Sequence, residues 1–447
     1  MTANTSLPAT TPNQPGGGTA HARRRDLVLM LLAAAALMTA WSFAVPVFEG
    51  PDEQAHWEYA HYVNHHHALP VESPNFPEAA SPPLYYILIS PIATKVELPP
   101  VGFLGKQYGV RTLQFPPRLY QNDSDDFSRF WFFRVARLVS VLMSVFTIWF
   151  CVLAGEEASG DPWTGLLAGG LLAFWPMFTF RAMNASNDAL MTMLCSLAFY
   201  LIFRMVRRGF TWGVGISAAV VIAGAFLTKI NAAVLPVAFF LALLSEKAPW
   251  RARLLRAAAL GALMLAIVAP WLVRNLQLYG ELLAQHAMYT MGTHPAHKLV
   301  YGWKYFQFFF PFHFTTSFIG VFGWMDVFMP GTVYLVYLIA LFSAGACWVG
   351  GLRERRIDFR LSAILAGTVL LNLVAVIHTN TTVAQPQGRY MLPSLPALAL
   401  LLALGLASRR SWSIFRTRLT LAGMAAINLV IVVFLVIPAY WPAVITR

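Results

Sequence analysis

Apolar runs long enough to cross a lipid bilayer recur along the whole of this 447-residue sequence. A helical run of about 20 apolar residues spans roughly 30 Å of hydrocarbon. Composition agrees, because 57% of the residues are hydrophobic and only 12% are charged, whereas soluble proteins carry about a quarter charged residues. The sequence therefore predicts an all-α integral membrane protein.

We expect about eleven transmembrane helices and, before them, a disordered cytoplasmic tail over residues 1–22, which are rich in Thr, Pro, Gly and Asn. Residues 23–447 then form one transmembrane domain. The first span is longer than the apolar core of a cleavable signal peptide, about 7–15 residues, and predicts an uncleaved signal anchor. The predicted spans are 27–47, 136–154, 164–180, 188–205, 212–229, 231–245, 256–275, 330–350, 361–378, 391–407 and 419–438.

The basic residues indicate the orientation of the chain, because cytoplasmic loops carry an excess of Lys and Arg. With the amino terminus inside, the cationic clusters at 204–208, 247–256, 353–360 and 409–418 all fall on the inner side. The net charge of +12 is thus mostly a topology signal, and we expect no nucleic acid partner. Two large loops, about 48–135 and 276–329, then lie outside, and the first should contain interfacial helices.

A group of titratable residues follows the first span, in the sequence FEGPDEQAHWEYAHYV. Asp52 and Glu53 are suited to accept a hydroxyl proton, since partial burial at the interface would raise a carboxyl pKa and improve the base. One of them could instead orient His56, which lies three to four residues on. The alternative is that both are ordinary first-turn acids after Pro51.

Further polar residues fall in the shorter outer turns. Asp188, with Asn187 before it, either binds substrate or acceptor or is an N-cap or first-turn acid of a helix. Arg389 offers the two parallel hydrogen bonds that suit a phosphate, against the alternative of a snorkelling interfacial arginine. Lys229 is a second candidate for the phosphate.

Two more residues complete the candidate substrate site. Tyr390 could line it or belong to an aromatic interfacial belt. Asp326 could face the cavity or cap the following helix. The Phe-rich stretch 305–324 before it is interpreted as interfacial or re-entrant.

Two patterns suggest a metal, NDSDD at 122–126 and the histidine run 65–67. Three consecutive histidines cannot all face one ion from a regular helix, and nothing near the acidic loop completes a cation site. We therefore predict no metal and no cofactor, with a divalent cation as the alternative.

Five motifs in order carry a family resemblance: PDEQAHWEYA, SPPLYYILISP, NASNDAL, SFIGVFGWMD and QPQGRYMLPSLP. The chain resembles the GT-C superfamily of multi-pass glycosyltransferases that use polyprenyl-phosphate sugars, and most closely a bacterial branch of it. The resemblance implies an acidic catalytic base in the first outer loop, here Asp52 or Glu53. It also implies a lipid-phosphate donor bound at the outer leaflet, and inversion at the sugar carbon.

The resulting hypothesis is a plasma-membrane glycosyltransferase that acts on its extracytoplasmic face. It would move a sugar from a polyprenyl-phosphate donor to a cell-envelope hydroxyl on a glycan, a lipid or a protein. A transporter or lipid flippase is the main rival, although no convincing internal repeat supports it. A GT-C-like membrane protein without activity is the third possibility.

Overall fold

The computed structural model describes residues 17–73, 76, 78–94, 131–288 and 302–441, and these residues are almost entirely helical. Eight segments are long and apolar enough to cross a membrane, which confirms the predicted all-α, multi-pass class. Six of them are the helices α1 (Gly17–Ala44), α5 (Trp131–Ser159), α8 (Asn187–Arg208), α11 (Trp250–Tyr279), α15 (Gly331–Arg353) and α16 (Phe359–Asn380). The other two combine α17 (Leu395–Ala407) and α18 (Ile414–Ile431) with adjoining short helices.

The predicted number of about eleven full spans is not confirmed, because three expected spans take other forms. The segments expected at 212–229 and 231–245 are the shorter helices α9 (Trp212–Phe226) and α10 (Val234–Leu244), joined by a 3₁₀ turn, η1 (Ile230–Ala233). The span expected at 164–180 is broken into α6 (Pro162–Ala173) and α7 (Pro176–Ala182), which meet at 70°. Pro176 explains the break, since proline cannot continue the hydrogen bonding of the preceding helix.

The amino-terminal end also differs from the prediction. Helix α1 begins at Gly17, so residues 17–22 are helical where a disordered tail was expected. Residues 1–16 lie outside the described part of the chain. The helix starts early because the residues from Thr19 to Asp26 contain no proline, and Ala and Arg are good helix formers.

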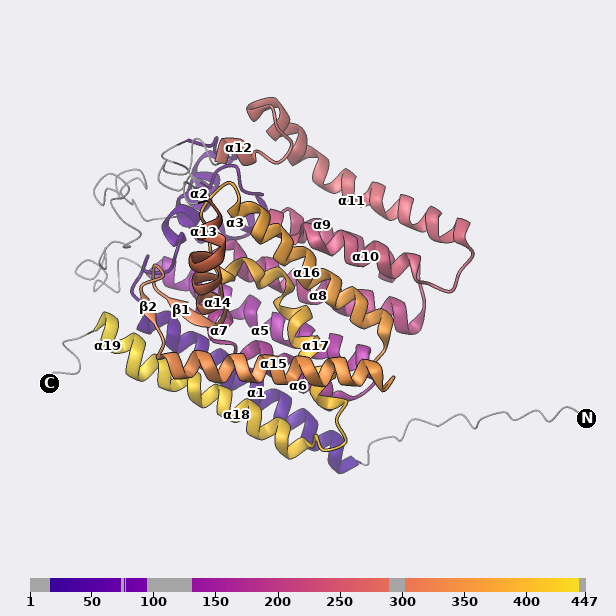
Figure 1. The fold of residues 1–447 in the computed structure, drawn as a ribbon. Helices are drawn as coiled ribbons and strands as arrows, with labels where there is room; N and C mark the ends of the chain where they lie inside the picture. The colour runs from indigo at the N-terminus through magenta and orange to yellow at the C-terminus, as the bar shows by residue number, and fades with distance from the viewer. Residues whose placement is uncertain (1–16, 74–75, 77, 95–130, 289–301, 442–447) are drawn as a thin grey trace, which may run out of the picture.

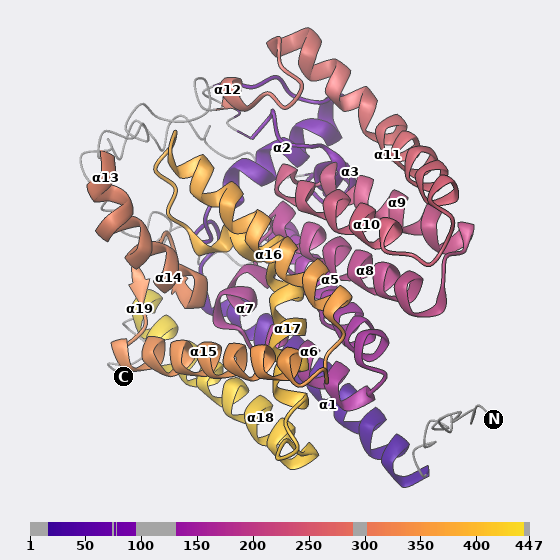
Figure 2. The same ribbon diagram turned by 45° about the vertical axis from the view of Figure 1, so that its right-hand side comes forward.

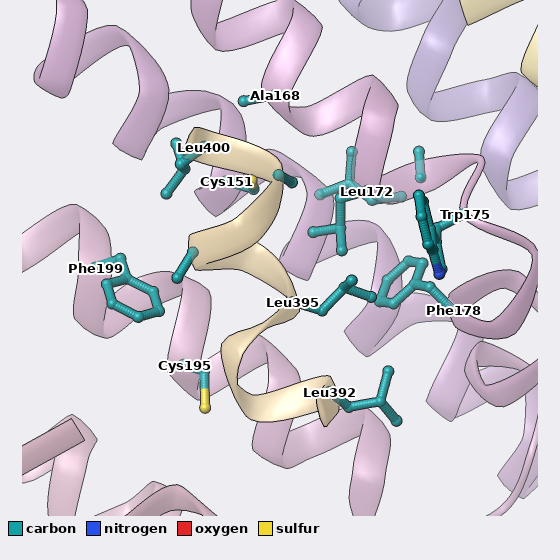
Figure 3. Close-up of a cluster of buried hydrophobic side chains, with 14 of the residues drawn as sticks. Cys151, Ala168, Leu172, Trp175, Phe178, Cys195, Phe199, Leu392, Leu395 and Leu400 are labelled. Atoms are coloured by element: carbon teal, nitrogen blue, oxygen red, sulfur yellow. The ribbon is translucent and has the colours of Figure 1, made fainter. Parts of the chain in front are cut away.

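A central group of helices is enclosed by peripheral ones that face outward. In the span 388–407, which contains α17, 78% of the most apolar 18-residue stretch is buried inside the protein. The corresponding share is only 17% in α15 and 22% in α11. Figures 1 and 2 show α17 inside the bundle, with α11 along one edge and α1 beside α18 along another. Figure 3 shows Leu392, Leu395 and Leu400 directed toward side chains of the surrounding helices. The apolar outer faces of α11 and α15 are those expected to contact lipid.

Ion pairs gather on one face of the bundle, which we call the basic face and define by Arg23, Arg207, Arg208, Arg356 and Arg418. These residues come from the predicted inner loops and the amino-terminal end of α1. Pairs such as Arg418 Nε to Asp26 Oδ2, at 2.6 Å, join elements far apart in sequence. The predicted grouping of the cationic loops on one side is therefore present in the fold.

The opposite face, which we call the site face, carries the short elements of the two large loops. In the first loop these are α2 (Glu53–His66) and α3 (Leu84–Ile89), and residues 95–130, with the NDSDD sequence, lie outside the described part. The second loop contains α12 (Gln285–Ala287), α13 (Gly302–Lys304), a π-helical turn η4 (Tyr305–Phe309) and α14 (Phe310–Gly320). A hairpin of β1 (Val321–Phe322) and β2 (Val327–Phe328) follows, with Val321 opposite Phe328.

Three short helical elements at the ends of long spans complete the site face. The 3₁₀ helix η5 (Gly388–Ser394) precedes α17, and the π-helical turn η6 (Val432–Val436) with α19 (Ile437–Tyr440) follows α18. Figure 1 shows α2, α3 and α14 at the same end of the bundle as the start of α8. The predicted functional residues lie almost entirely among these elements.

Candidate active site

Glu53 is the fully buried member of the adjacent carboxylate pair, with none of its side chain exposed. Its Oε2 accepts a hydrogen bond from Arg137 Nη2 at 2.6 Å and one from the Gly50 amide at 3.3 Å. Its Oε1 accepts from Arg137 Nε at 2.9 Å and from the Ala185 amide at 3.1 Å. Both oxygens of Glu53 are thus occupied by protein donors.

Arg137 has no donor left for a ligand. Besides its two bonds to Glu53, Nη1 donates to the carbonyls of Ser42 and Val45, at 2.9 and 2.7 Å, and Nη2 donates to that of Pro46, at 2.8 Å. A guanidinium has five N–H groups, so these contacts use all of them. The ion pair between Glu53 and Arg137 thus holds the end of α1 and the start of α2 against α5. Its role is structural.

Asp52 points away from this pair because its backbone is left-handed, with φ 67° and ψ 2°. Such a conformation is uncommon for a residue other than glycine. Its side chain does not cap α2; instead Oδ2 pairs with Arg389 Nη2 at 2.6 Å. One third of the Asp52 side chain is exposed (33%). The accessible carboxylate of the pair is therefore Asp52.

Gly388 places Arg389 beside Asp52. A Cβ on Gly388 would lie 2.2 Å from the Phe318 amide nitrogen and 2.3 Å from its Cα, so η5 can pass α14 this closely only with glycine. The Gly388 amide also donates to Ser317 Oγ at 2.7 Å. The second large loop thus positions the guanidinium that faces the first.

The charge of Asp52 is set by opposing effects. Burial raises the pKa of this carboxyl group, but the positive charge of Arg389, the neighbouring His56 and the positive charge of Arg181 lower it more, to about 2. Asp52 is therefore ionised throughout the physiological pH range.

Asp188 holds two further cations. Its Oδ2 accepts from Arg181 Nε at 3.1 Å and Nη2 at 2.7 Å, and its Oδ1 accepts from Lys229 Nζ at 2.6 Å. Of the two structural alternatives, the N-cap is excluded because Ser186 occupies that position, whereas Asp188 does lie in the first turn of α8, where an acidic side chain is favoured. Arg181 Nη1 also donates to the Pro51 carbonyl at 3.3 Å, which joins this cluster to the segment carrying Asp52.

His56 is buried and lies one turn after Asp52 on α2. Its Nδ1 is 2.8 Å from the Tyr86 hydroxyl, which also accepts a hydrogen bond from Asn187 Nδ2 at 3.2 Å. Burial, with smaller opposing effects from nearby charges, lowers the pKa of His56 to about 3. His56 is therefore a neutral imidazole at physiological pH.

Of the last two predicted residues, Tyr390 lies at the site and Asp326 does not. Tyr390 lies beside Arg389, whose guanidinium carbon is 5.4 Å from the Tyr390 ring centroid. Asp326 is exposed in the turn between β1 and β2, where its amide donates to the Phe322 carbonyl at 3.2 Å, and it takes no part in the ion pairs described above. The alternative that Asp326 caps the following helix is wrong, because the N-cap of α15 is Pro330.

Four site residues were not among the sequence candidates. Arg137 and Arg181 had a usable signal, since a charged residue inside an apolar span is costly and usually has a partner and a function. Nothing in the sequence marks Tyr86 as different from the other aromatic residues of its motif. Glu78 belongs to the site through its charge: burial and the negative charge of Asp52 raise its pKa.

Within the described ranges, no three His, Cys, Asp or Glu side chains are placed to hold an ion. A separate cavity of about 470 Å³ opens on the basic face, lined by residues that include Glu157, Tyr200 and Arg208. Its Arg208 is already paired with Glu157 at 2.6 Å, and it contains none of the site-face residues.

Sequence comparison matches part of the chain to a family. Residues 132–273 match the family model of dolichyl-phosphate-mannose-protein mannosyltransferases. This segment includes Arg137, Arg181, Asp188 and Lys229 but not Asp52 or Arg389. No curated protein matches the chain significantly in sequence.

Solved structures share the fold over nearly the whole chain. ArnT from Cupriavidus metallidurans, bound to undecaprenyl phosphate, superposes with a TM-score of 0.53 at 15% identity, covering 92% of this chain and 73% of that one. AglB, the oligosaccharyltransferase of Archaeoglobus fulgidus, in complex with an inhibitory peptide and a dolichol-phosphate, gives 0.54 at 14% identity, covering 95% and 56%. The chain thus spans little more than half the length of the archaeal enzyme.

These similarities confirm the resemblance that the five motifs predicted. The superposition covers nearly the whole chain, and the segment matched by the family model lies within it. The chain is thus an all-α membrane protein that shares the fold of ArnT and AglB, and residues 132–273 of it match the mannosyltransferase family model.

Proposed function

We propose that this protein transfers a sugar from a polyprenyl-phosphate donor to a hydroxyl group of a cell-envelope acceptor, on the extracytoplasmic side of the plasma membrane. The observation that carries the proposal is the accessible Asp52 carboxylate, paired with Arg389 on the site face. The undecaprenyl phosphate in ArnT and the dolichol-phosphate in AglB support a lipid-phosphate donor.

In this reaction Asp52 accepts the proton of the acceptor hydroxyl as its oxygen attacks the anomeric carbon. The bond from that carbon to the phosphate oxygen breaks, the polyprenyl phosphate leaves with the electron pair, and the sugar carbon is inverted. General-base catalysis of this kind typically contributes about 10²–10⁴-fold. Glu53 cannot take this role without leaving Arg137 unpaired, since Arg137 occupies both its oxygens.

Arg389 couples donor binding to the base. With Arg389 beside it, Asp52 has a pKa of about 2 and is a weak base. When the guanidinium turns to the donor phosphate, Asp52 loses its strongest cationic partner and its pKa rises, which makes proton transfer more favourable. Lys229 and Arg181 share the single carboxylate of Asp188, so Lys229 can also contribute positive charge to the phosphate.

The direct test is transfer from a labelled polyprenyl-phosphate sugar by the purified protein in proteoliposomes supplied with an envelope acceptor fraction. Formation of a labelled glycosidic product supports the proposal. Movement of lipid or solute with no new glycosidic bond would instead support a transporter.

Replacement of Arg389 should weaken donor binding in the same assay. Arg389→Met removes charge-assisted hydrogen bonds worth about 1.5–3 kcal/mol each, so we expect the KM for the donor to rise roughly 10- to 100-fold. Arg389→Lys should restore only part of this, because an ammonium cannot form the paired contact of a guanidinium. Arg360→Met, the same change at an exposed residue of the basic face, is the matched control. An unchanged donor KM in Arg389→Met would exclude phosphate binding by this residue.

The pH profile should lack an acid limb in the physiological range. The kcat/KM profile reports groups of the free enzyme, and the pKa values of Asp52 and His56 are about 2 and about 3. Above about pH 4 Asp52 is ionised and ready to accept a proton, so we expect kcat/KM to stay flat from about pH 5 to about pH 7. A steep rise in that interval, abolished by Glu78→Gln, would assign the base to Glu78, whose pKa is raised.

A further inference from the structure

Three side chains from three elements form a buried hydrogen-bonded row beside the proposed base. Asn187 at the start of α8 donates from Nδ2 to the Tyr86 hydroxyl of α3, at 3.2 Å. The same hydroxyl lies 2.8 Å from Nδ1 of His56 on α2. The His56 and Tyr86 rings are stacked, with centroids 5.7 Å apart and planes 28° apart. The orientation of the His56 ring is therefore fixed by packing as well as by the hydrogen bond.

The hydrogen bonds of this row run in one direction, from Asn187 through Tyr86 to His56. An amide nitrogen only donates, so the Tyr86 oxygen accepts from Asn187. A tyrosine hydroxyl has a single proton. Ser81 also lies beside the Tyr86 hydroxyl, but the 2.8 Å contact with His56 Nδ1 is the one with hydrogen-bond geometry, so we assign the proton to that contact and Nδ1 accepts it. A neutral imidazole carries one N–H, which then lies on Nε2.

Several charges surround His56 and decide its protonation. Burial lowers its pKa first; Asp52 and Asp188 raise it, and Lys229 and Arg181 lower it, with a result of about 3. A cationic histidine would donate from both ring nitrogens and could not accept from Tyr86. The low pKa and the row of hydrogen bonds thus require the same state, a neutral ring with the proton on Nε2.

Among the described residues the Nε2–H group has no acceptor, and His56 is only 2% exposed, so a ligand would meet this group inside the site and not at the surface. Nε2 is not one of the fully enclosed, unpartnered polar atoms of the site. His56 is one helical turn from Asp52, and its amide donates to the Asp52 carbonyl at 3.1 Å. A neutral N–H donor at this position suits an uncharged oxygen, a hydroxyl or ether oxygen of a sugar, better than a phosphate, which favours cations.

We propose that His56 binds a hydroxyl or ether oxygen of the sugar or acceptor through Nε2–H, and that Tyr86 and Asn187 are positioning residues that hold His56 in this tautomer. The inference rests on the proposed function, because it assigns a substrate contact within the same site.

Two substitutions of His56 distinguish the two ring nitrogens. The amide of His56→Gln reaches about the position of Nε2 and can still donate to substrate. The amide of His56→Asn reaches about the position of Nδ1, where its oxygen can still accept from Tyr86, but it offers no donor at Nε2. We expect His56→Asn to lower kcat/KM roughly 10-fold, the effect of losing one hydrogen bond, and His56→Gln to stay within about 3-fold of native. If His56 only supports Tyr86, the order of the two variants will be reversed.

A spectroscopic measurement tests the tautomer without using activity. Selective ¹⁵N-histidine labelling, with the His56 signal assigned by its loss in His56→Gln, should show Nδ1 unprotonated and Nε2 protonated at about pH 7. Tyr86→Phe and, more weakly, Asn187→Leu should shift this signal toward a mixture of tautomers. A protonated Nδ1 in the native protein overturns the inference.

The outcomes keep the two proposals apart. Absence of transfer by the native protein, or full activity of an Asp52 variant, would count against the proposed function and leave the tautomer result standing. Transfer that requires Asp52 but is equally sensitive to His56→Asn and His56→Gln would overturn only the role of Nε2 as a donor to substrate.

Discussion

Asp52→Asn is expected to lower sugar transfer by about 10²–10⁴-fold, the usual contribution of a general base, while the protein still folds. Asparagine has nearly the same shape and can still accept a hydrogen bond from Arg389, but it cannot take up a proton. Arg389, whose side chain is only 9% exposed, loses its anionic partner but keeps a hydrogen-bond acceptor, so we expect some loss of stability and not a failure to fold. The measurement is the initial rate with saturating labelled donor in proteoliposomes.

The matched control is Glu354→Gln, which makes the same carboxyl-to-amide change on the basic face, where Glu354 is 44% exposed. This variant should transfer sugar at the native rate. Asp52→Glu should recover little activity, since the longer side chain moves the carboxylate away from its present contact with Arg389. Transfer by Asp52→Asn at the native rate would rule out Asp52 as the base.

Glu53→Gln and Arg137→Met are expected to act on folding instead of on chemistry. Removing one partner of a buried ion pair typically costs about 3–5 kcal/mol, because the other charge is left buried and uncompensated. Arg137→Met would in addition leave the Ser42, Val45 and Pro46 carbonyls without this donor. We expect low yields of folded protein and a lower thermal unfolding midpoint in detergent for both single variants.

The double variant Glu53→Gln, Arg137→Met provides the control for this interpretation. Residues in one hydrogen-bonded pair are not additive, so the double variant should lose less stability than the sum of the two single ones. A Glu53→Gln protein with native thermal stability and no transfer activity would contradict the structural role and make Glu53 the base. The two adjacent carboxylates are therefore distinguished by different measurements. Asp52→Asn should change the rate of sugar transfer, and Glu53→Gln should change the thermal unfolding midpoint.

Much of the fold could be predicted from hydrophobic runs and loop charges, because the position of a span and its orientation both depend on local composition. The break between α6 and α7 was missed because Pro176 lies in a run that is apolar on both sides, and hydropathy does not register a bend. The number of complete spans is not confirmed for a related reason: α9 and α10 are shorter apolar helices, separated by the polar residues Thr228, Lys229 and Asn231.

The site was predictable as a set of residues but not as a set of contacts. Asp52 and Glu53 are adjacent and chemically alike, so the choice between them could not be made locally. It depends on Arg137, 84 residues after Glu53, and on Arg389 near the other end of the chain. The left-handed backbone at Asp52, which turns the two side chains apart, likewise follows from the packing and not from a glycine signal.

The bend after α6 also bears on how deep the reaction lies. Helix α6 has 12 residues and rises only about 18 Å, well short of the roughly 30 Å of a bilayer's hydrocarbon. The chain thus turns at the level of the lipid tails, where a free carbonyl is costly; Asn428 of α18 meets this need by donating to the Phe174 carbonyl at 2.7 Å. Phe174 and Trp175 at this turn are only 3% and 6% exposed, so protein encloses it and neither thinned lipid nor water is needed beside it. The 70° bend thus directs α7, with Arg181 near its end, without exposing polar backbone to lipid.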